Sequence, residues 1–253
     1  MSAGAAVELQ AFLRASAAGG RTVVAVPPFT AYLNAADPLR FLNYAIPDGD
    51  VEPSAAQVDA LREAFRARER LPRLEWVEEA APRVAPPLAE AGMVEELRTP
   101  IMACAPGDLA DVEADVQDLS VAPVGDDEVR ATSDLQRVAF GMDPLPPDQP
   151  PPSFARPSGG GAVLARAGRT PVAVAIWTRV IDGCSEVAGV ATAERWRRRG
   201  LAGVVTAAAA RAAFVAGAGL CVLSPGDDSA QRVYARAGFR AAATVLHWSD
   251  AGE

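Results

Sequence analysis

The sequence is poor in the residue types that build metal sites and disulfide frameworks. Its 253 residues include three cysteines, one histidine and no lysine. The cysteines, Cys104, Cys184 and Cys221, lie far apart and form no CxxC spacing, and His247 is the single imidazole. This pattern argues against a disulfide scaffold, a zinc site and a Cys–His catalytic pair, so we expect no metal.

Long apolar runs are also missing. No stretch of roughly 18 apolar residues occurs, and no basic-then-apolar signal opens the chain. The alanine-rich run after Gly200 contains Arg211 and is too weakly hydrophobic to span a bilayer. We therefore expect a soluble, cytoplasmic protein without a membrane partner. The net charge of −8 argues against a nucleic-acid partner, because nucleic-acid binders present a basic face.

Apolar content and length are what the chain does have. Half of its residues are hydrophobic, which is enough for a sizeable core. Domains cluster near ~100–150 residues, so the length suits one large domain or two of ordinary size. Alternating strand and helix patterns predict an α/β protein. We place the boundary after Ala105, which gives an accessory α/β domain at 1–105 and a second domain at 106–253.

One stretch, residues 187–214, contains most of the residues that could bind a ligand. A short strand is predicted at 186–192, and four arginines follow between Arg195 and Arg199, interrupted by Trp196. Small residues at 200–203 then open a long helix. The first turn of a helix carries unpaired N–H groups and partial positive charge, which suits a phosphate, and arginine binds phosphate with paired donors. The order strand, arginine–glycine turn, helix therefore predicts an anion site.

A second pattern follows a short apolar strand predicted at 220–223. A turn leads into a helix predicted at 229–237. Across the turn, the helix and the two residues after it, Asp227, Ala230, Tyr234, Gly238 and Phe239 stand at fixed spacing. Two spaced motifs in this order, each after an apolar strand, are far more specific than either motif alone.

The two motifs resemble those of the GNAT N-acetyltransferases. Residues 197–202 fit the pattern Gln/Arg-x-x-Gly-x-Gly/Ala, and residues 227–239 fit Asn-x-x-Ala-x-x-x-Tyr-x-x-x-Gly-Phe with aspartate in place of asparagine. The resemblance covers about residues 115–248. It implies the GNAT fold, a mixed central sheet flanked by helices, and direct transfer of an acetyl group from acetyl-CoA, the co-substrate, to a primary amine.

The resemblance also implies which residues hold acetyl-CoA. The bulged strand would offer main-chain groups to the pantetheine and polarise the thioester carbonyl, and the turn would hold the pyrophosphate. Asp227 keeps a hydrogen-bond acceptor but loses the amide donors of asparagine. The implied cofactor-binding residues are Val190, Ala191, Thr192, Arg197, Arg198, Arg199, Gly200, Leu201, Ala202, Gly203, Asp227 and Ala230.

Two side chains are implied in the chemistry itself. Tyr234 is the family's usual general acid toward the departing CoA thiolate. Glu186, at the start of the central strand, matches a position where some members place a general base, with Asp182 and Glu194 as other options. The sequence leaves the acceptor open among an antibiotic, a polyamine, an amino acid and a peptide or protein amine. A homodimer is possible within the family. The alternative to an enzyme is a non-catalytic acetyl-CoA sensor or scaffold module.

The first half resembles a reduced copy of the second. Residues 88–93 (LAEAGM) echo residues 234–239 (YARAGF), and we predict an internal repeat. No arginine–glycine turn precedes its central helix, only Asp48, Asp50 and Glu52, and acidic residues there would repel a pyrophosphate. This half is therefore predicted to be a degenerate GNAT-like domain, or else an unrelated α/β domain. Its expected helices are 7–18, 55–70 and 83–91, and its expected strands are 22–26, 40–46, 73–77 and 94–104.

The remaining elements of the second half are a strand at 119–124, a helix at 126–141 and a hairpin of 162–167 with 171–180. The stretch 143–161, rich in proline and glycine, is expected to be an extended loop. It would act either as a mobile lid or as a surface connector.

Overall fold

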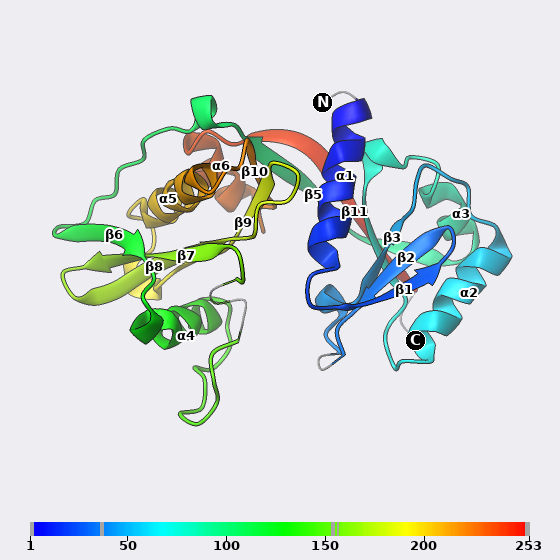
Figure 1. Ribbon diagram of the computed structural model, residues 1–253, viewed down its shortest axis with the longest axis horizontal. Helices are drawn as coiled ribbons and strands as arrows, with labels where there is room; N and C mark the ends of the chain where they lie inside the picture. The colour runs from blue at the N-terminus through cyan, green and yellow to red at the C-terminus, as the bar shows by residue number, and fades with distance from the viewer. Residues whose placement is uncertain (1–2, 36–37, 153–154, 156, 251–253) are drawn as a thin grey trace. The chain divides into compact units, whose positions relative to one another are not determined.

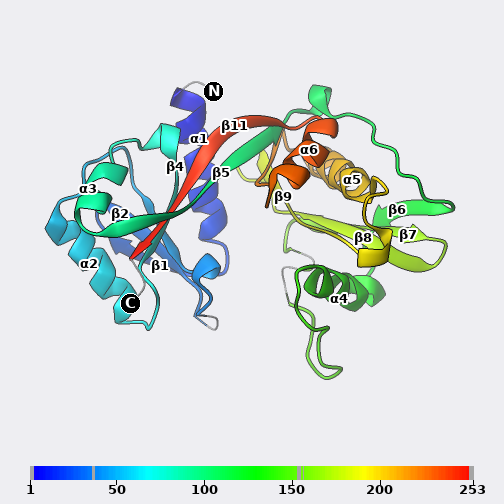
Figure 2. The same ribbon diagram turned by 180° about the vertical axis from the view of Figure 1, so that it is seen from behind.

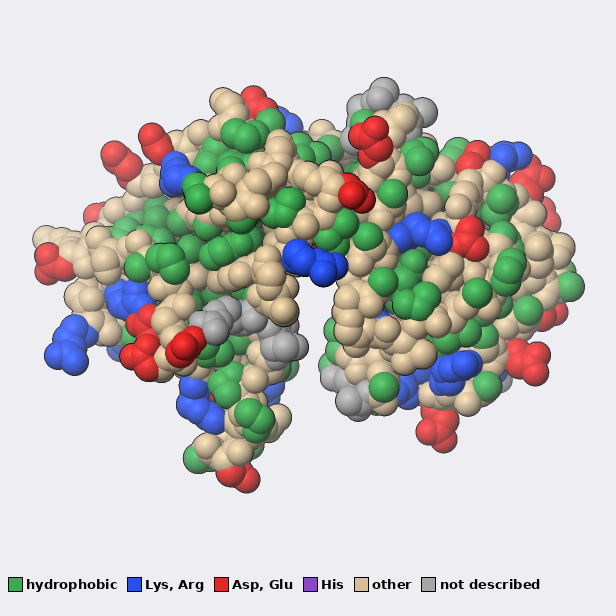
Figure 3. Space-filling view, viewed as in Figure 1, with side chains coloured by type: hydrophobic (Ala, Val, Ile, Leu, Met, Phe, Trp, Pro, Cys, Tyr) green, Lys and Arg blue, Asp and Glu red, His purple; other side chains and the backbone are tan. Residues whose placement is uncertain are grey.

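The computed structural model describes residues 3–35, 38–152, 155 and 157–250. The chain divides into two compact units, residues 1–100 with 242–253 (unit 1) and residues 101–241 (unit 2) (Figure 1). None of the described helices has the length and hydrophobicity needed to cross a bilayer. The three cysteines are buried free thiols. On the face seen in Figure 3, acidic and basic side chains are interspersed over each unit.

Unit 1 is a twisted sheet with helices on both faces. Its strands β1, β2 and β3 pair antiparallel in sequence order, β3 pairs parallel with β4, and β4 pairs antiparallel with β11. Helix α1 covers one face, and α2 and α3 lie on the other (Figures 1 and 2). The bounds are α1 Ala3–Ala17, β1 Thr22–Val26, β2 Phe29–Leu33, β3 Tyr44–Pro47, α2 Ala55–Arg66, β4 Arg73–Val77, α3 Ala85–Glu90, β5 Met93–Cys104 and β11 Arg240–Asp250.

Unit 2 repeats this plan with one further strand, β6. Strands β6 to β9 pair antiparallel in order, and β9 pairs parallel with β10. Helix α4 packs on one face of β8 and β9, while α5 packs on the other (Figure 1). The bounds are β6 Leu119–Pro123, α4 Val129–Ala139, β7 Gly161–Ala167, β8 Thr170–Trp177, β9 Cys184–Thr192, α5 Leu201–Val215, β10 Leu220–Leu223 and α6 Asp228–Arg236.

The order of elements shows the internal repeat. The run β1-β2-β3-α2-β4-α3-β5 has the same order, and the same pairing through its first four strands, as β7-β8-β9-α5-β10-α6-β11. In each run a glycine with positive φ, Gly92 (φ 82°) or Gly238 (φ 103°), joins the last helix to the last strand. Glycine adopts this conformation without the steric cost that a Cβ brings. The echo between 88–93 and 234–239 therefore marks equivalent turns.

The last strands of the two repeats are exchanged. The end of β5 enters unit 2 and pairs antiparallel with β10, with Cys104 opposite Cys221. The end of β11 enters unit 1 and pairs with β4, with His247 opposite Glu75. Residues 242–253, which the sequence analysis placed in the second domain, thus belong to unit 1. Their assignment follows from strand pairing, which a boundary drawn in chain order does not capture.

Several elements of the structure differ from the prediction. The strand expected at 40–46 is a 3-10 helix at Arg40–Leu42 followed by β3, and β2 was not predicted. The diproline Pro27-Pro28 reads as the end of a strand in the sequence, but it forms the turn between β1 and β2. The described part of 143–160 contains no α-helix or strand, as expected, while residues 153, 154 and 156 lie outside the described residues.

A buried charged cluster lies in unit 1. Arg73 on β4 is fully buried; its Nε donates to Glu96 Oε2 at 2.9 Å, and its guanidinium also pairs with Glu75. His247 lies 3.1 Å from Arg73 through Nδ1 and 3.1 Å from the Thr99 hydroxyl through Nε2. Burial opposes ionisation of Glu75, but the hydrogen bond from His247 and the charge of Arg73 outweigh it and lower its pKa. The single histidine therefore ties β11 to β4 and β5.

Candidate functional site

The central strand of unit 2 carries a β-bulge. Along β8 and β9 the register changes between the pairs Val174–Ala191 and Ile176–Ala188, so that two residues of β9 oppose one of β8. Gly189 lies in the bulge with φ 57°, a conformation that favours glycine. The sequence signal for this feature was the glycine inside a β-branched strand.

Between the bulge and α5, two residues have positive φ angles. Arg198 has φ 63° and Gly200, the N-cap of α5, has φ 86°. For a non-glycine residue the left-handed conformation costs about 1–2 kcal/mol, and such cost is tolerated mostly where a site needs the geometry. A Cβ on Gly200 would lie 2.6 Å from the main-chain oxygen of Glu113. Glycine is thus required here by both conformation and space.

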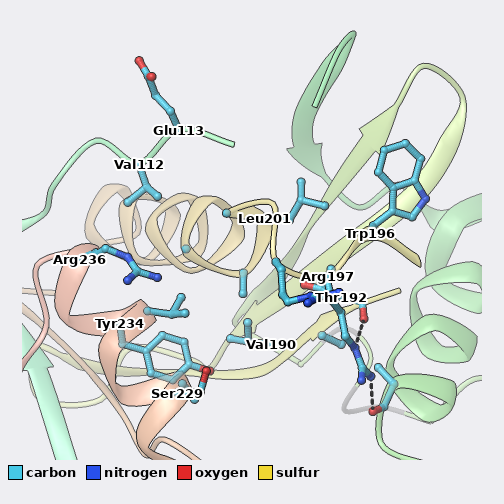
Figure 4. A pocket seen from close by; sticks show the side chains of 18 of the residues that line it. Val112, Glu113, Val190, Thr192, Trp196, Arg197, Leu201, Ser229, Tyr234 and Arg236 are labelled. Atoms are coloured by element: carbon cyan, nitrogen blue, oxygen red, sulfur yellow. Dashed lines mark hydrogen bonds between the residues drawn. The ribbon is translucent and has the colours of Figure 1, made fainter. Parts of the chain in front are cut away.

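The arginines around this turn contact main-chain oxygens and an aromatic ring. Arg197 donates from Nε to the Thr192 carbonyl and from Nη2 to the Ala139 carbonyl, each at 3.3 Å (Figure 4). The Arg199 guanidinium lies 5.0 Å from the centre of the Trp196 ring. Within the described residues no ion pair neutralises these arginines, so their positive charge adds to that of the α5 N-terminus.

Helix α6 supplies the opposite wall. Asp227 caps it, its Oδ1 accepting from the Ala230 N–H at 2.7 Å. One turn further on, Tyr234 is 9% exposed, and burial together with the nearby Asp227 charge raises the pKa of its phenol. The hydroxyl therefore stays protonated across the neutral range and is available as a proton donor.

These elements enclose one cavity of about 980 Å³ in unit 2. Val190 from β9, Leu201 at the start of α5 and Tyr234 from α6 face the same space, with Arg236 pointing into it (Figure 4). Of the predicted residues, the cavity is lined by Val190, Ala191, Thr192, Arg197, Arg198, Gly200, Leu201, Ala202, Gly203, Ala230 and Tyr234. Arg199, Asp227 and Glu186 are not part of its lining.

Other lining residues were missed by the sequence analysis. Ser229, Val233 and Arg236 share a helix with Ala230 and Tyr234, and the i, i+3, i+4 spacing of α6 could have identified Val233. The segment preceding β6 contributes Asp111, Val112 and Glu113, and no motif marks it. Ala139 and Phe140, at the end of α4, complete the set.

Glu186 lies on β9 before the bulge. Its main chain pairs with Thr178, whose Oγ1 accepts from the Glu186 N–H at 2.9 Å. Val187 packs with the α5 side of the sheet and Ala188 with the α4 side, so alternation places Glu186 on the α4 face. The cavity wall formed by Tyr234 belongs to the α5 side. The two predicted catalytic residues therefore approach β9 from opposite faces.

Two polar side-chain groups beside the cavity are buried without partners in the described part of the chain. The Thr192 hydroxyl and the Trp196 indole N–H are buried and have no hydrogen-bond partner among the described residues. Both residues line the cavity. Buried polar groups without partners are rare, and each costs about 1–3 kcal/mol, which the packing around them must offset. The arrangement suits a long ligand with an anionic group at the arginine–glycine turn.

The equivalent place in unit 1 is filled by protein. Strands β3 and β4 pair at Ala45–Leu74, and side chains from α1 occupy the gap beyond. Gln10 donates to the Pro47 carbonyl at 3.3 Å and accepts from the Val77 N–H at 3.1 Å. Among the described residues, Gln10 thus bridges the ends of β3 and β4, where unit 2 has its cavity.

Fold and site together define an acyltransferase. A family model described as the acetyltransferase (GNAT) family matches residues 129–239. The chain is 36% identical to a GCN5-related N-acetyltransferase from Kribbella flavida, with a TM-score of 0.83 and coverage of 98% of this chain and 96% of that one. This chain therefore belongs to the GNAT acetyltransferase family.

More distant structures share the fold. A GNAT-family structure from Novosphingobium aromaticivorans is 20% identical with a TM-score of 0.59, covering 98% of this chain and 97% of that one. A tandem GNAT protein from the clavulanic acid biosynthesis pathway is 14% identical with a TM-score of 0.62, covering 89% and 79%. No curated protein matches the sequence. The predicted fold class, a GNAT fold with a tandem GNAT-like half, is thus confirmed.

Proposed function

We propose that this protein transfers an acetyl group from acetyl-CoA directly to a primary amine. The observation that carries the proposal is the convergence on one cavity of three parts. These are the strand past the bulge, the arginine–glycine turn before α5 and the buried phenol of Tyr234. They match the three chemical needs of such a donor, namely amide partners for its arm, cations for its pyrophosphate and a proton for its leaving thiolate.

The charge and the main-chain groups of the cavity residues support acetyl-CoA as the donor. Main-chain N–H groups at the start of α5, with Arg197 and Arg198, would hold the pyrophosphate. Val190 and Thr192 would pair through their main chain with the amides of the pantetheine arm. A main-chain N–H at the bulge would polarise the thioester carbonyl and stabilise the oxyanion that forms as the amine attacks.

In the proposed reaction the amine nitrogen bonds to the thioester carbon and the carbon–sulfur bond breaks. The thiolate leaves with the electron pair and takes a proton, or a strong hydrogen bond, from Tyr234. The attacking nitrogen loses its proton to a base, for which we propose Glu186, directly or through water. The placement of Glu186 on the face of β9 opposite to Tyr234 suits acceptor and donor arriving from two sides. Asp182 and Glu194 are the other carboxylates nearby in sequence.

Two measurements test the proposal. Calorimetry should show acetyl-CoA binding, and release of free thiol should require a primary amine from a panel containing a polyamine, an amino sugar and a lysine peptide. Tyr234→Phe should lower kcat by about 10²-fold or more with little change in acetyl-CoA affinity. Tyr32→Phe, which alters a buried tyrosine of unit 1, is the matched control. Absence of coenzyme binding would refute the proposal.

The same experiments address the alternative of a sensor or scaffold module. Tight acetyl-CoA binding without turnover, unchanged by Tyr234→Phe, would favour that alternative. The negative net charge of the protein favours cationic acceptors over anionic ones. We propose neither a nucleic acid nor a membrane as partner, and a homodimer is a further proposal that sedimentation would test.

A further inference from the structure

A buried glutamine holds the bulge of β9 from the α4 side. Gln136 is 1% exposed, and its Nε2 donates to the carbonyl oxygen of Gly189 at 2.9 Å. A Cβ on Gly189 would lie 2.4 Å from the same Nε2 atom. The amide and the bare backbone therefore fit each other closely, and a larger residue at 189 would displace the glutamine.

This contact fixes the direction of one peptide group. In a trans peptide the carbonyl oxygen and the following N–H point in opposite directions. Gln136 reaches Gly189 from α4, which packs on one face of β9, so the Gly189 carbonyl points toward that face. The Val190 N–H must then point toward the opposite face. Val190 itself lines the cavity beside Tyr234 and packs with the α5 side (Figure 4).

The packing of α4 against β9 holds Gln136 in place. Leu135 and Ala139, its neighbours on α4, pack with Ala188 and Ala191 of β9 on both sides of the bulge. Its Oε1 has no hydrogen-bond partner among the described residues, so the side chain's one hydrogen bond is that to Gly189. A buried amide that leaves half of its capacity unused is costly, which argues for a role of the remaining bond beyond packing.

We infer that Gln136 is a positioning residue for acyl transfer: it orients the Gly189–Val190 peptide so that the Val190 N–H meets the thioester carbonyl oxygen. The inference rests on the proposed function. Loss of an oxyanion donor typically costs about 10²–10³-fold in kcat, and misalignment of a donor that is still present costs less. We therefore expect Gln136→Met, which keeps the side-chain length but donates no hydrogen bond, to lower kcat by about tenfold or more.

The test combines turnover with a spectroscopic signature. Acetyl-CoA labelled with ¹³C at the acetyl carbonyl is bound to the wild-type protein and to Gln136→Met. A hydrogen bond to the carbonyl oxygen moves the ¹³C resonance downfield, so the wild type should show a downfield resonance and the variant one closer to the free thioester. Acetyl-CoA affinity should change little, because the arginine–glycine turn lies outside the substitution. Ser133→Ala removes a buried hydroxyl from the same helix that has no hydrogen-bond partner among the described residues; it is the matched control and should keep the wild-type resonance.

The outcomes separate the inference from the proposed function. A wild type that neither binds nor uses acetyl-CoA refutes the proposed function and this inference with it. A wild type that does both, with Gln136→Met matching it in kcat and in ¹³C shift, refutes the inference alone. Equal losses in Gln136→Met and Ser133→Ala, with matching falls in melting temperature, also refute it, because they indicate a general weakening of α4. A selective loss of kcat and downfield shift in Gln136→Met supports it.

Discussion

Replacement of Gly200 by alanine is the sharpest test of the arginine–glycine turn at the start of α5. Gly200 has φ 86°, and a Cβ there would lie 2.6 Å from Glu113 O and 3.2 Å from Ala114 Cα. Both atoms belong to the main chain, so no side chain can rotate away to make room. The substitution therefore strains the backbone and forces the segment before β6 away from the turn.

The magnitude follows from two separate costs. The left-handed conformation costs an alanine about 1–2 kcal/mol relative to glycine. Overpacking of a close contact adds about 1–3 kcal/mol. Gly217, just after α5, provides the control, because it has φ 102° but nothing within 4 Å of its added Cβ. Gly217→Ala should therefore lose about 1–2 kcal/mol and Gly200→Ala about 2–5 kcal/mol of the free energy of unfolding.

Urea denaturation of both variants measures the stability difference, and calorimetry with CoA measures its effect on the site. Gly200→Ala should bind CoA about tenfold or more weakly, which corresponds to about 1.4 kcal/mol, while Gly217→Ala should bind as the wild type does. If Gly200→Ala proves no less stable than Gly217→Ala, the close approach of residues 113–114 does not matter energetically. If CoA affinity is also unchanged, the turn is not the pyrophosphate site.

Three further predictions follow from the exchanged strands, the buried thiols and unit 1. A fragment of residues 106–253 should not fold, because it lacks β5, the antiparallel partner of β10, and leaves β11 without β4; a dispersed, well-resolved NMR spectrum of this fragment would contradict the prediction. Stability should fall as the pH rises above about 8.5, because the unfolded thiols ionise there while burial raises the folded pKa to about 11 for Cys104 and about 12 for Cys184 and Cys221. The loss should reach at most about 2 kcal/mol per thiol at pH 10, and Cys221→Ala should reduce it in urea titrations at pH 7.5 and 10. Calorimetry should give one bound CoA per chain, because side chains of α1 fill the gap between β3 and β4; two equivalents would show that this gap opens.

The sequence by itself determined the class of the protein and most of the cavity. Strand, turn and helix periodicities are local, and the spacing of Arg197 to Ala202 and of Ala230 to Tyr234 fixes which residues share one turn or one helix face. Because most of the predicted site residues lie within such local motifs, eleven of the fourteen line the cavity. Glu186 and Asp227 were predicted by position in a motif, and the structure places the first on the other face of β9 and uses the second as a helix cap.

Only the tertiary structure decided the rest, since it depends on contacts between segments far apart in the chain. The exchange of β5 and β11 is a matter of pairing partners, which the alternation within a strand does not encode. The hydrogen bond from Gln136 to Gly189 joins residues 53 positions apart, and nothing in the helix pattern of α4 distinguishes that glutamine from a solvated one. The wall of residues 111–113 arises because the chain before β6 crosses the start of α5, where glycines leave room for its backbone.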